Sequence, residues 1–155
     1  MDKNQIYRKF LTILENIILR NYVDDGIIAT NDFGRSVESV INGNSLKVLG
    51  AAHVFQIVNG RRPGTMPPVE AIKRWIREKK GLPAFFRQKI DSIAWAIAIN
   101  IKKKGITVPN QYNDGELINK SVNEFMEEHF QDMLSELGQV FVFDIRNTIR
   151  TAFAA

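Results

Sequence analysis

The chain of 155 residues contains no cysteine and only two histidines. Without cysteine it can form no disulfide bridge, thiolate nucleophile or cysteine-ligated zinc site, and this absence is typical of a reducing compartment. His53 and His129 stand on separate apolar-rich segments, with no acidic or hydroxyl partner at a catalytic spacing. We therefore expect no catalytic, cofactor-binding or metal-binding residues, and no enzymatic activity.

Long hydrophobic runs and low-complexity tracts are also missing. The longest strongly apolar stretch, residues 92–101, is too short to cross a hydrocarbon layer, and the polar N-terminal residues lack the pattern of a secretory signal. Hydrophobic residues make up 45% of the chain, which is enough for one packed core at this length. The sequence predicts a soluble single domain, residues 1–155, with no membrane partner.

Acidic residues are scarce between residues 61 and 104, and basic residues are scarce between residues 113 and 137. The first segment holds 12 of the 21 basic residues of the chain. They are Arg61, Arg62, Lys73, Arg74, Arg77, Lys79, Lys80, Arg87, Lys89, Lys102, Lys103 and Lys104. The second segment has Lys120 as its one basic residue and seven acidic residues, which are Asp114, Glu116, Glu124, Glu127, Glu128, Asp132 and Glu136. The molecule is therefore electrically polar along its sequence, although its net charge is only +4.

Two charged faces follow from this distribution. The candidate basic face consists of Lys73, Arg74, Arg77 and Lys80. The candidate acidic contact face consists of Glu124, Glu127, Glu128 and Asp132. Twelve basic residues can bind nucleic acid by counterion release if they share a face, but no helix-turn-helix, zinc finger or aromatic stacking sheet is recognisable. The basic face is equally compatible with the solvated side of an ordinary helix.

Hydrophobic periodicity predicts a long amphipathic helix from Lys3 to Val23. The pattern then changes to two short β-prone pieces, residues 37–41 and 46–49, on either side of Asn42-Gly43-Asn44-Ser45. Because Asn-Gly favours a tight turn between strands, this segment predicts a hairpin. Residues 27–30 are a candidate third strand.

Helices are expected again after the hairpin. Residues 51–59 favour a short helix with Gly60 as its left-handed cap. Pro67-Pro68 predicts the start of a helix that Gly81 ends, and Pro83 predicts the start of another that runs to Lys104. This last helix is apolar on nearly every face, which indicates a central position or a second partner. Trp75 and Trp95 are expected to be core anchors.

The last third of the chain is also expected to be helical. A helix is predicted from residue 113 or 114 to Leu137, with Gly138 as its break, and residues 140–153 favour a helix over a strand. The predicted fold class is thus α+β: a mostly helical domain with a small antiparallel hairpin or sheet near residues 27–50, packed on long amphipathic helices.

Four stretches, in this order along the chain, resemble the head-tail joining family of tailed bacteriophages: "AAHVFQIVNG", "RRPGTMPP", "VEAIKRWIREKKG" and "IAWAIAINIKKKGI". Proteins of this family are called neck, tail-completion or minor tail proteins. The resemblance covers about residues 36–108 and lies in the order of the elements. The chain departs from the family at His53, where a tyrosine is common, and in continuing to residue 155 with a helical, acidic extension, 113–155.

The resemblance implies a structural virion protein of a tailed phage or prophage, assembled in the host cytoplasm, without a catalytic role. It would form a homo-oligomeric ring at the head-tail junction, through which the DNA passes. Its partners would be copies of itself and other neck, portal-adjacent or tail proteins, with non-specific proximity to genomic DNA. The over-apolar helix and the two opposed charged segments agree with subunits that meet through different surfaces.

The loop of Gly60, Arg61, Arg62, Pro63 and Gly64 is the candidate inter-subunit or DNA-channel loop. We expect it to contact an adjacent subunit or ring, with Arg61 and Arg62 facing the channel. A plain turn between two elements is the alternative. For the whole chain, a small basic DNA-binding accessory protein and an enzyme with an unrecognised site are the other classes left open.

Overall fold

The fold is mostly helical. The computed structural model describes residues 2–25, 35–43, 45–50 and 54–153, and this part of the chain contains seven helices and one two-stranded antiparallel sheet. It is 69% helical, so the predicted α+β fold class is confirmed. The candidate third strand at residues 27–30 and His53 lie outside the described residues.

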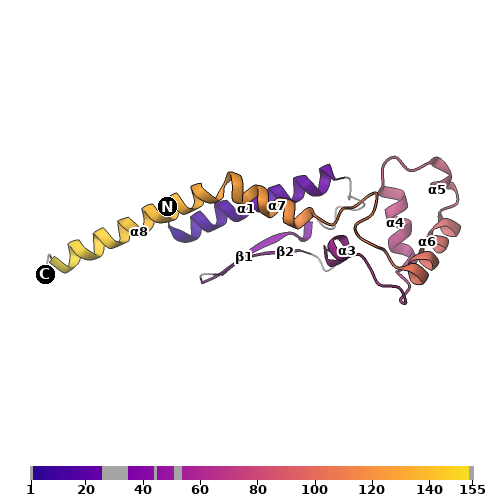
Figure 1. Cartoon of the computed structure of the whole chain (residues 1–155), viewed down its shortest axis with the longest axis horizontal. Coiled ribbons are helices and arrows are strands. Elements are labelled where there is room, and N and C mark those ends of the chain that lie inside the picture. Colours follow the sequence, from indigo (N-terminus) through magenta and orange to yellow (C-terminus); the bar gives the residue numbers. More distant parts are fainter. Residues whose placement is uncertain (1, 26–34, 44, 51–53, 154–155) are drawn as a thin grey trace.

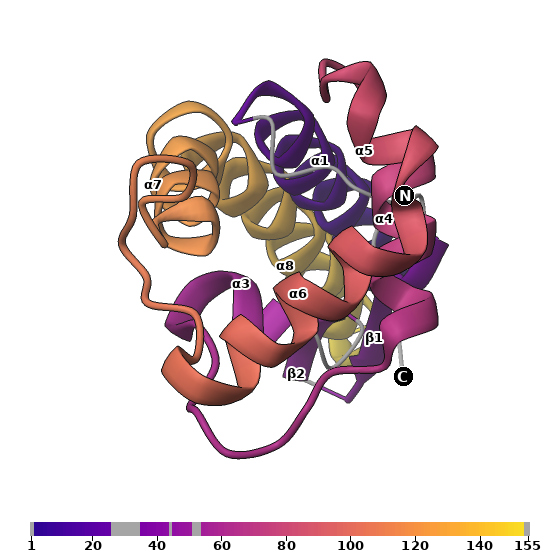
Figure 2. The same ribbon diagram turned by 90° about the vertical axis from the view of Figure 1, so that its right-hand side faces the viewer.

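The molecule is elongated and has two helical parts (Figure 1). At one end lie α4 (Val69–Glu78), α5 (Ala84–Gln88) and α6 (Ile90–Lys104). At the other end, α8 (Phe130–Phe153) extends away from the rest of the molecule and carries the C-terminus. Viewed along the long axis, α4, α5 and α6 lie in front of the remaining helices (Figure 2). We call α4, α5 and α6 the three-helix unit and the rest the main body.

Helix α1 (Lys3–Asp24) is the central element of the main body, as its periodicity predicts. It begins with a capping box: the Asp2 carboxylate accepts a 2.9 Å hydrogen bond from the backbone N–H of Gln5, whose side chain accepts one of 2.8 Å from the Asp2 N–H. Its buried apolar side chains are Ile6, Phe10, Leu11, Ile17, Ile18 and Tyr22. This wide apolar face allows α1 to contact the hairpin, α7 and α8 at once.

The predicted hairpin is confirmed. Strands β1 (Glu38–Asn42) and β2 (Ser45–Leu49) pair with Glu38 opposite Leu49, and the turn contains Gly43 at a φ of 59°. Val48 points to the core formed by Ile18 and Tyr22 of α1, so the hairpin covers one side of α1.

Two helices pack on the other side of α1, and both segments predicted to be helical in this part of the chain are helical. Helix α7 (Leu117–Glu128) ends with His129 as its C-cap, and α8 runs without interruption through Gly138. The predicted position of the break is therefore wrong by nine residues along the chain. The turn at His129 lets Phe125 and Phe130 both pack on the Phe10 core. Glycine in a helix costs only about 1 kcal/mol, which the packing of Leu137 and Val140 on the same core offsets.

The three-helix unit has its own core of Ile72, Ile76, Ala94 and Ala98. The single helix predicted from Pro83 to Lys104 is wrong, because the chain turns at Lys89, whose φ of −116° and ψ of 39° separate α5 from α6. The turn lets Phe86 and Ile90 both pack on this core.

Only one of the two tryptophans is a core anchor. Trp75 packs against the core of the three-helix unit, as expected. Trp95 is 52% exposed, so its predicted core position is wrong. Its small neighbour Ala94 and Ala98 one turn further on lie fully buried against α4, which turns the indole of Trp95 to the outside.

The three-helix unit is inserted between α3 (Val54–Asn59) and α7, and its entering and leaving chains are paired. Arg61 and Ile106 exchange two backbone hydrogen bonds of 2.8 Å each. Gly60, the predicted left-handed cap of α3, has a φ of 74° and its N–H donates to the Gln56 carbonyl. A Cβ on Gly60 would lie 2.1 Å from the Ile106 oxygen, and one on Gly105 would lie 2.2 Å from the Arg61 oxygen. Glycine at both positions therefore permits the pairing.

That the three-helix unit and the main body act as a single domain stays a prediction.

Gly105→Ala is expected to lower the free energy of unfolding by about 3 kcal/mol, because it adds a backbone clash to a positive φ that side chains avoid. Gly81→Ala is the matched control: Gly81 has a φ of 81°, but a Cβ there meets no described atom within 4 Å, so about 1 kcal/mol is expected. Urea unfolding of both variants measures the difference. Equal losses would contradict the proposed close contact of the two chains.

Candidate functional site

The predicted loop, Gly60 to Gly64, lies at the junction of the two parts. The guanidinium of Arg61 donates a 3.2 Å hydrogen bond to the Thr65 carbonyl, and its backbone is paired with Ile106. The Gly64 N–H donates to the Lys102 carbonyl at 2.8 Å. Arg62 and Pro63 are exposed. The structure therefore fixes the backbone of this loop and leaves Arg62, rather than Arg61, as its outward-facing cation.

Lys73 of the candidate basic face bridges two helices. Its ammonium lies 2.7 Å from the carboxylate of Asp91 on α6 and 2.8 Å from that of Glu70, and its side chain is 17% exposed. Hydrogen bonds to Asp91 and then to Glu70 raise the pKa of Lys73, and the bond from Lys73 lowers the pKa of Asp91. Lys73 thus holds α4 against α6, and less of its charge is available to a partner.

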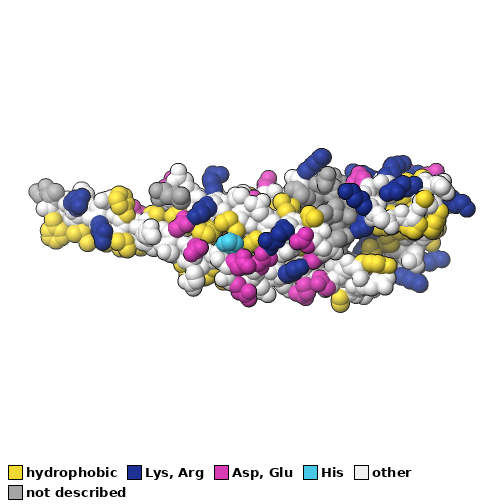
Figure 3. Space-filling model, turned by 90° about the horizontal axis from the view of Figure 1, so that it is seen from above, with side chains coloured by type: hydrophobic (Ala, Val, Ile, Leu, Met, Phe, Trp, Pro, Cys, Tyr) yellow, Lys and Arg dark blue, Asp and Glu magenta, His cyan; other side chains and the backbone are white. Residues whose placement is uncertain are grey.

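The other basic residues keep the charge of the three-helix unit at the surface. Arg74, Arg77 and Lys80 of the candidate basic face are exposed. Lys102, Lys103 and Lys104, in the last turn of α6, are exposed as well. Lysine and arginine side chains gather on this end of the molecule (Figure 3). The basic segment of the sequence is therefore also a basic region in space.

The candidate acidic face, like the basic face, has one residue engaged within the fold and three that are exposed. Glu124 is engaged by α1 at the edge of the main body, where its carboxylate accepts hydrogen bonds from the guanidinium of Arg20 and, at 3.1 Å, from the amide of Asn21. The bond from Arg20 and then that from Asn21 lower the pKa of Glu124. Glu127, Glu128 and Asp132 are exposed. They form the acidic corner, our name for these three residues where α7 meets α8.

Sequence reasoning missed the polar seam between α1 and α7. Asn21 and Ser121 are buried, and the Asn21 amide donates a 3.1 Å hydrogen bond to the Ser121 hydroxyl, which donates to the Leu117 carbonyl at 2.7 Å. Buried polar groups need such partners, so the pair fixes the position of α7 along α1. The spacing of Asn21 on an otherwise apolar helix face was the available signal.

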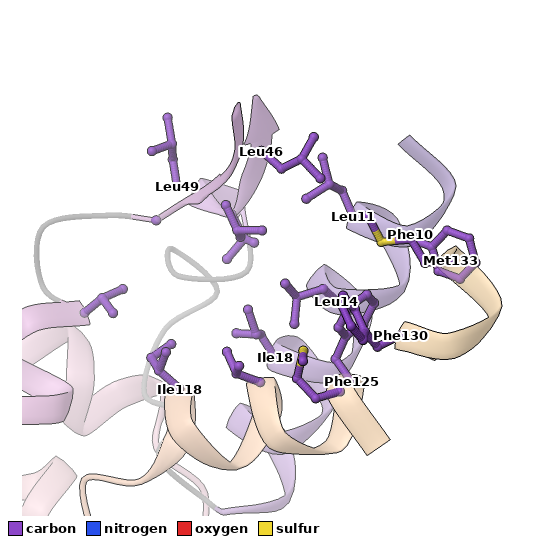
Figure 4. Close-up of a pocket in the computed structure, with 16 residues that line it drawn as sticks. Phe10, Leu11, Leu14, Ile18, Leu46, Leu49, Ile118, Phe125, Phe130 and Met133 are labelled. Carbon is purple, nitrogen blue, oxygen red and sulfur yellow. The ribbon is translucent and has the colours of Figure 1, made fainter. Parts of the chain in front are cut away.

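An apolar groove with about 440 Å³ of open volume was also missed. It lies between the hairpin, α1, α7 and the start of α8 (Figure 4). Figure 4 shows Leu46 of β2, Leu14 and Ile18 of α1 and Ile118 of α7 around the same space. Periodicity identified the apolar side of each helix, but it could not show that an open space remains between these sides in the folded chain. Half-exposed Val122 and Met126 lie on its α7 wall.

Among the residues that the structure describes, no three His, Asp or Glu side chains gather in a way that could hold a metal ion. No described helix is long and apolar enough to span a membrane. His129 lies beside the Phe125 ring, with its Nε2 3.8 Å from the Glu128 carboxylate.

Comparisons with known proteins assign no relationship, since no family model, no curated protein and no solved structure matches this chain. Function is therefore inferred from the surfaces themselves.

The Glu124 contacts predict a pH dependence. Because they lower the pKa of Glu124 below its ordinary value of 4.5, their stabilisation is present above that value and is lost as the pH falls through the folded-state pKa. Glu124→Gln should lower stability at pH 7 and flatten its decline below about pH 4.5. Glu127→Gln, an exposed change on the same helix, is the control. Chemical unfolding at several pH values measures both, and parallel curves for Glu124→Gln and the unmodified chain would contradict the role of this contact.

Proposed function

We propose that the chain is a structural virion protein of a tailed phage or prophage, located at the head-tail junction, where copies form a ring through which the DNA passes. The observation that carries this proposal is the spatial separation of charge: an exposed basic end on the three-helix unit and the acidic corner on α7 and α8 (Figure 3). The proposal includes no catalytic step.

Separated charges of opposite sign suit a subunit that meets its copies through two different surfaces. Such heterologous contacts repeat from copy to copy and form a closed ring when the rotation between copies permits. Complementary potentials also orient the subunits before they touch. The acidic corner and the basic end lie on different helices, so one copy can present its acidic corner while its neighbour presents its basic end.

The basic end also suits a wall that faces DNA. Positive side chains attract phosphates without reading bases, as a channel that passes any sequence requires. The hydrogen bond from Gly64 to Lys102 holds the loop of Arg62 against the last turn of α6, which carries three exposed lysines. This gives Gly60 to Gly64 a place in the proposed ring, with Arg62 toward the DNA or the next ring.

The resemblance of residues 36–108 adds to the same proposal. These residues form the hairpin, α3 and the three-helix unit, together with the paired chains at Arg61 and Ile106. Under this proposal the other partners are neck, portal-adjacent or tail proteins, and α7 and α8 are an addition to residues 36–108.

A small basic DNA-binding accessory protein is the second candidate. The observation that favours it is the exposed cluster of Arg62, Lys102, Lys103 and Lys104 on one end of the molecule. About four phosphate contacts from such a cluster would give salt-dependent binding by a single copy. A ring instead needs many copies before its channel charges surround a duplex.

Arg62→Glu is expected to reduce the yield of infectious particles at least about tenfold while leaving the fold intact, because Arg62 is exposed and carries the outward charge of the loop. Lys47→Glu, the same charge reversal at an exposed position of β2, is the control and should leave the yield unchanged. Particle counts from a phage genome carrying each change measure the effect. Normal yields from Arg62→Glu would remove the loop from the proposed interface.

Binding to a random DNA duplex separates the two candidate functions. If the ring proposal holds, a single copy should bind with a Kd weaker than about 100 µM at physiological salt, at the weak limit of non-specific binding. A Kd below about 1 µM that weakens steeply with added salt would favour the accessory protein. Fluorescence anisotropy of a labelled duplex across a salt series gives both quantities.

A further inference from the structure

The end of α8 is a free helical arm. Every residue from Phe141 to Phe153 is exposed, and Figure 1 shows this part of α8 extending away from the main body. At 1.5 Å per residue the arm is about 20 Å long. Isolated helices of this length are marginal in water, so an arm of this kind gains from a partner that covers one face.

The arm has an apolar stripe. Phe141, Ile145 and Ile149 follow one another at intervals of four residues, and Val142 and Phe153 widen the same face. All five are about half or more exposed; Phe141 reaches 71% and Phe153 reaches 88%. Such a stripe of anchors is what a helix presents to an apolar groove on another protein surface. Its exposed apolar area indicates an interaction site.

The apolar groove matches the arm in chemistry, but the arm of a given copy cannot reach the groove of that same copy. Phe130 and Met133, at the start of α8, line the groove, and α8 continues as one helix. Ile145 therefore lies about 18 Å further along a straight axis. A second hollow, between the start of α1 and α8, is a poorer match: Phe141, Phe143 and Asp144 of the arm itself form part of its lining. The rest of that lining includes charged groups such as Asp2 and Lys9.

Charge favours a second copy of this chain as the occupant. Arg146 and Arg150 are exposed on the arm, where Asp144 is the one acidic residue. The α7 and α8 wall of the groove belongs to the segment with seven acidic residues, and its acidic corner is exposed. The arm is therefore basic, the lining of the groove is uncharged, and the acidic corner lies on the two helices that form this wall. These opposite charges steer an arm toward the α7 and α8 side of another copy and keep two arms apart.

We propose that the arm of one copy, residues 141–153, docks in the apolar groove of the next copy, with Ile145 and Ile149 as its central anchors. The contact joins two different surfaces, so it passes from copy to copy and leaves a free arm and a free groove until a ring closes. The inference rests on the homo-oligomer of the proposed function, and it names the surfaces that join the subunits.

Two variants that each remove one side of the contact test this docking. Ile145→Asp combined with Ile149→Asp removes the arm anchors, and Val122→Asp places a charge in the groove at a position that is 40% exposed. The matched controls, Asn147→Asp with Thr151→Asp and Asn123→Asp, add the same charges at exposed positions beside the contact. Circular dichroism checks that each variant folds. Leu49→Asp, 44% exposed on the hairpin wall, replaces the groove variant if Val122→Asp does not fold.

Sedimentation equilibrium at concentrations up to about 1 mM measures the mass of each sample. The unmodified chain and the controls should show masses that rise with concentration. Each variant alone should stay at the single-chain mass of 17.7 kDa. A mixture of the two variants should form a dimer and nothing larger, because one intact arm can meet one intact groove and no second contact is left.

Three results would overturn the docking. If both variants associate like the unmodified chain, the copies meet through other surfaces. If the groove variant associates and the arm variant does not, the arms pair with one another. If the unmodified chain stays at the single-chain mass throughout, the arm has no affinity for the groove. None of these results decides the proposed function, which the particle yields of Arg62→Glu test separately.

Discussion

The backbone pairing of Arg61 with Ile106 is the constraint on which the arrangement of this molecule depends. The three-helix unit leaves the main body after α3 and returns before α7, so its position is set where these two chains meet. Two hydrogen bonds of 2.8 Å and the absence of side chains at Gly60 and Gly105 bring the chains into contact. Without this junction, the basic end would have no fixed position relative to the acidic corner.

Charge in this molecule divides into an internal and an external set. Lys73 and Glu124 hold helices together, the first between α4 and α6 and the second between α1 and α7. The external set, represented by Arg62 and the acidic corner, faces outward. Because contacts between helices of the same chain already engage the first set, the second set is the one available for contacts between molecules. The surfaces that remain exposed, charged and apolar, occur in complementary pairs, which is the physical basis for proposing self-assembly.

Elements with a strong local signal could be predicted from the sequence, and those set by packing could not. The periodicity of α1, the Asn-Gly turn of the hairpin and Gly60 as a left-handed cap are local properties of the chain. The break at His129 rather than at Gly138 depends on Phe125 and Phe130 sharing the core of Phe10, a contact between distant residues. Such contacts override the helix preference of a single residue.

The same distinction between local signals and packing explains which features of the candidate site could be predicted from the sequence. Charge along the sequence predicted the two regions, but not that Lys73 and Glu124 would be engaged within the fold. Trp95 was expected in the core because it lies on or beside an apolar helical stripe, yet Ala94 and Ala98 occupy the buried side. The groove could not be predicted because it is a space between elements that are each apolar, and periodicity carries no information on their separation.

The proposed ring at the head-tail junction can be located by gold labelling of the chain in intact particles, followed by electron microscopy. If copies of this chain form the ring, the label should lie at the single point where head and tail meet. Particles that carry no label, or label spread over the head with the packaged DNA, would contradict it.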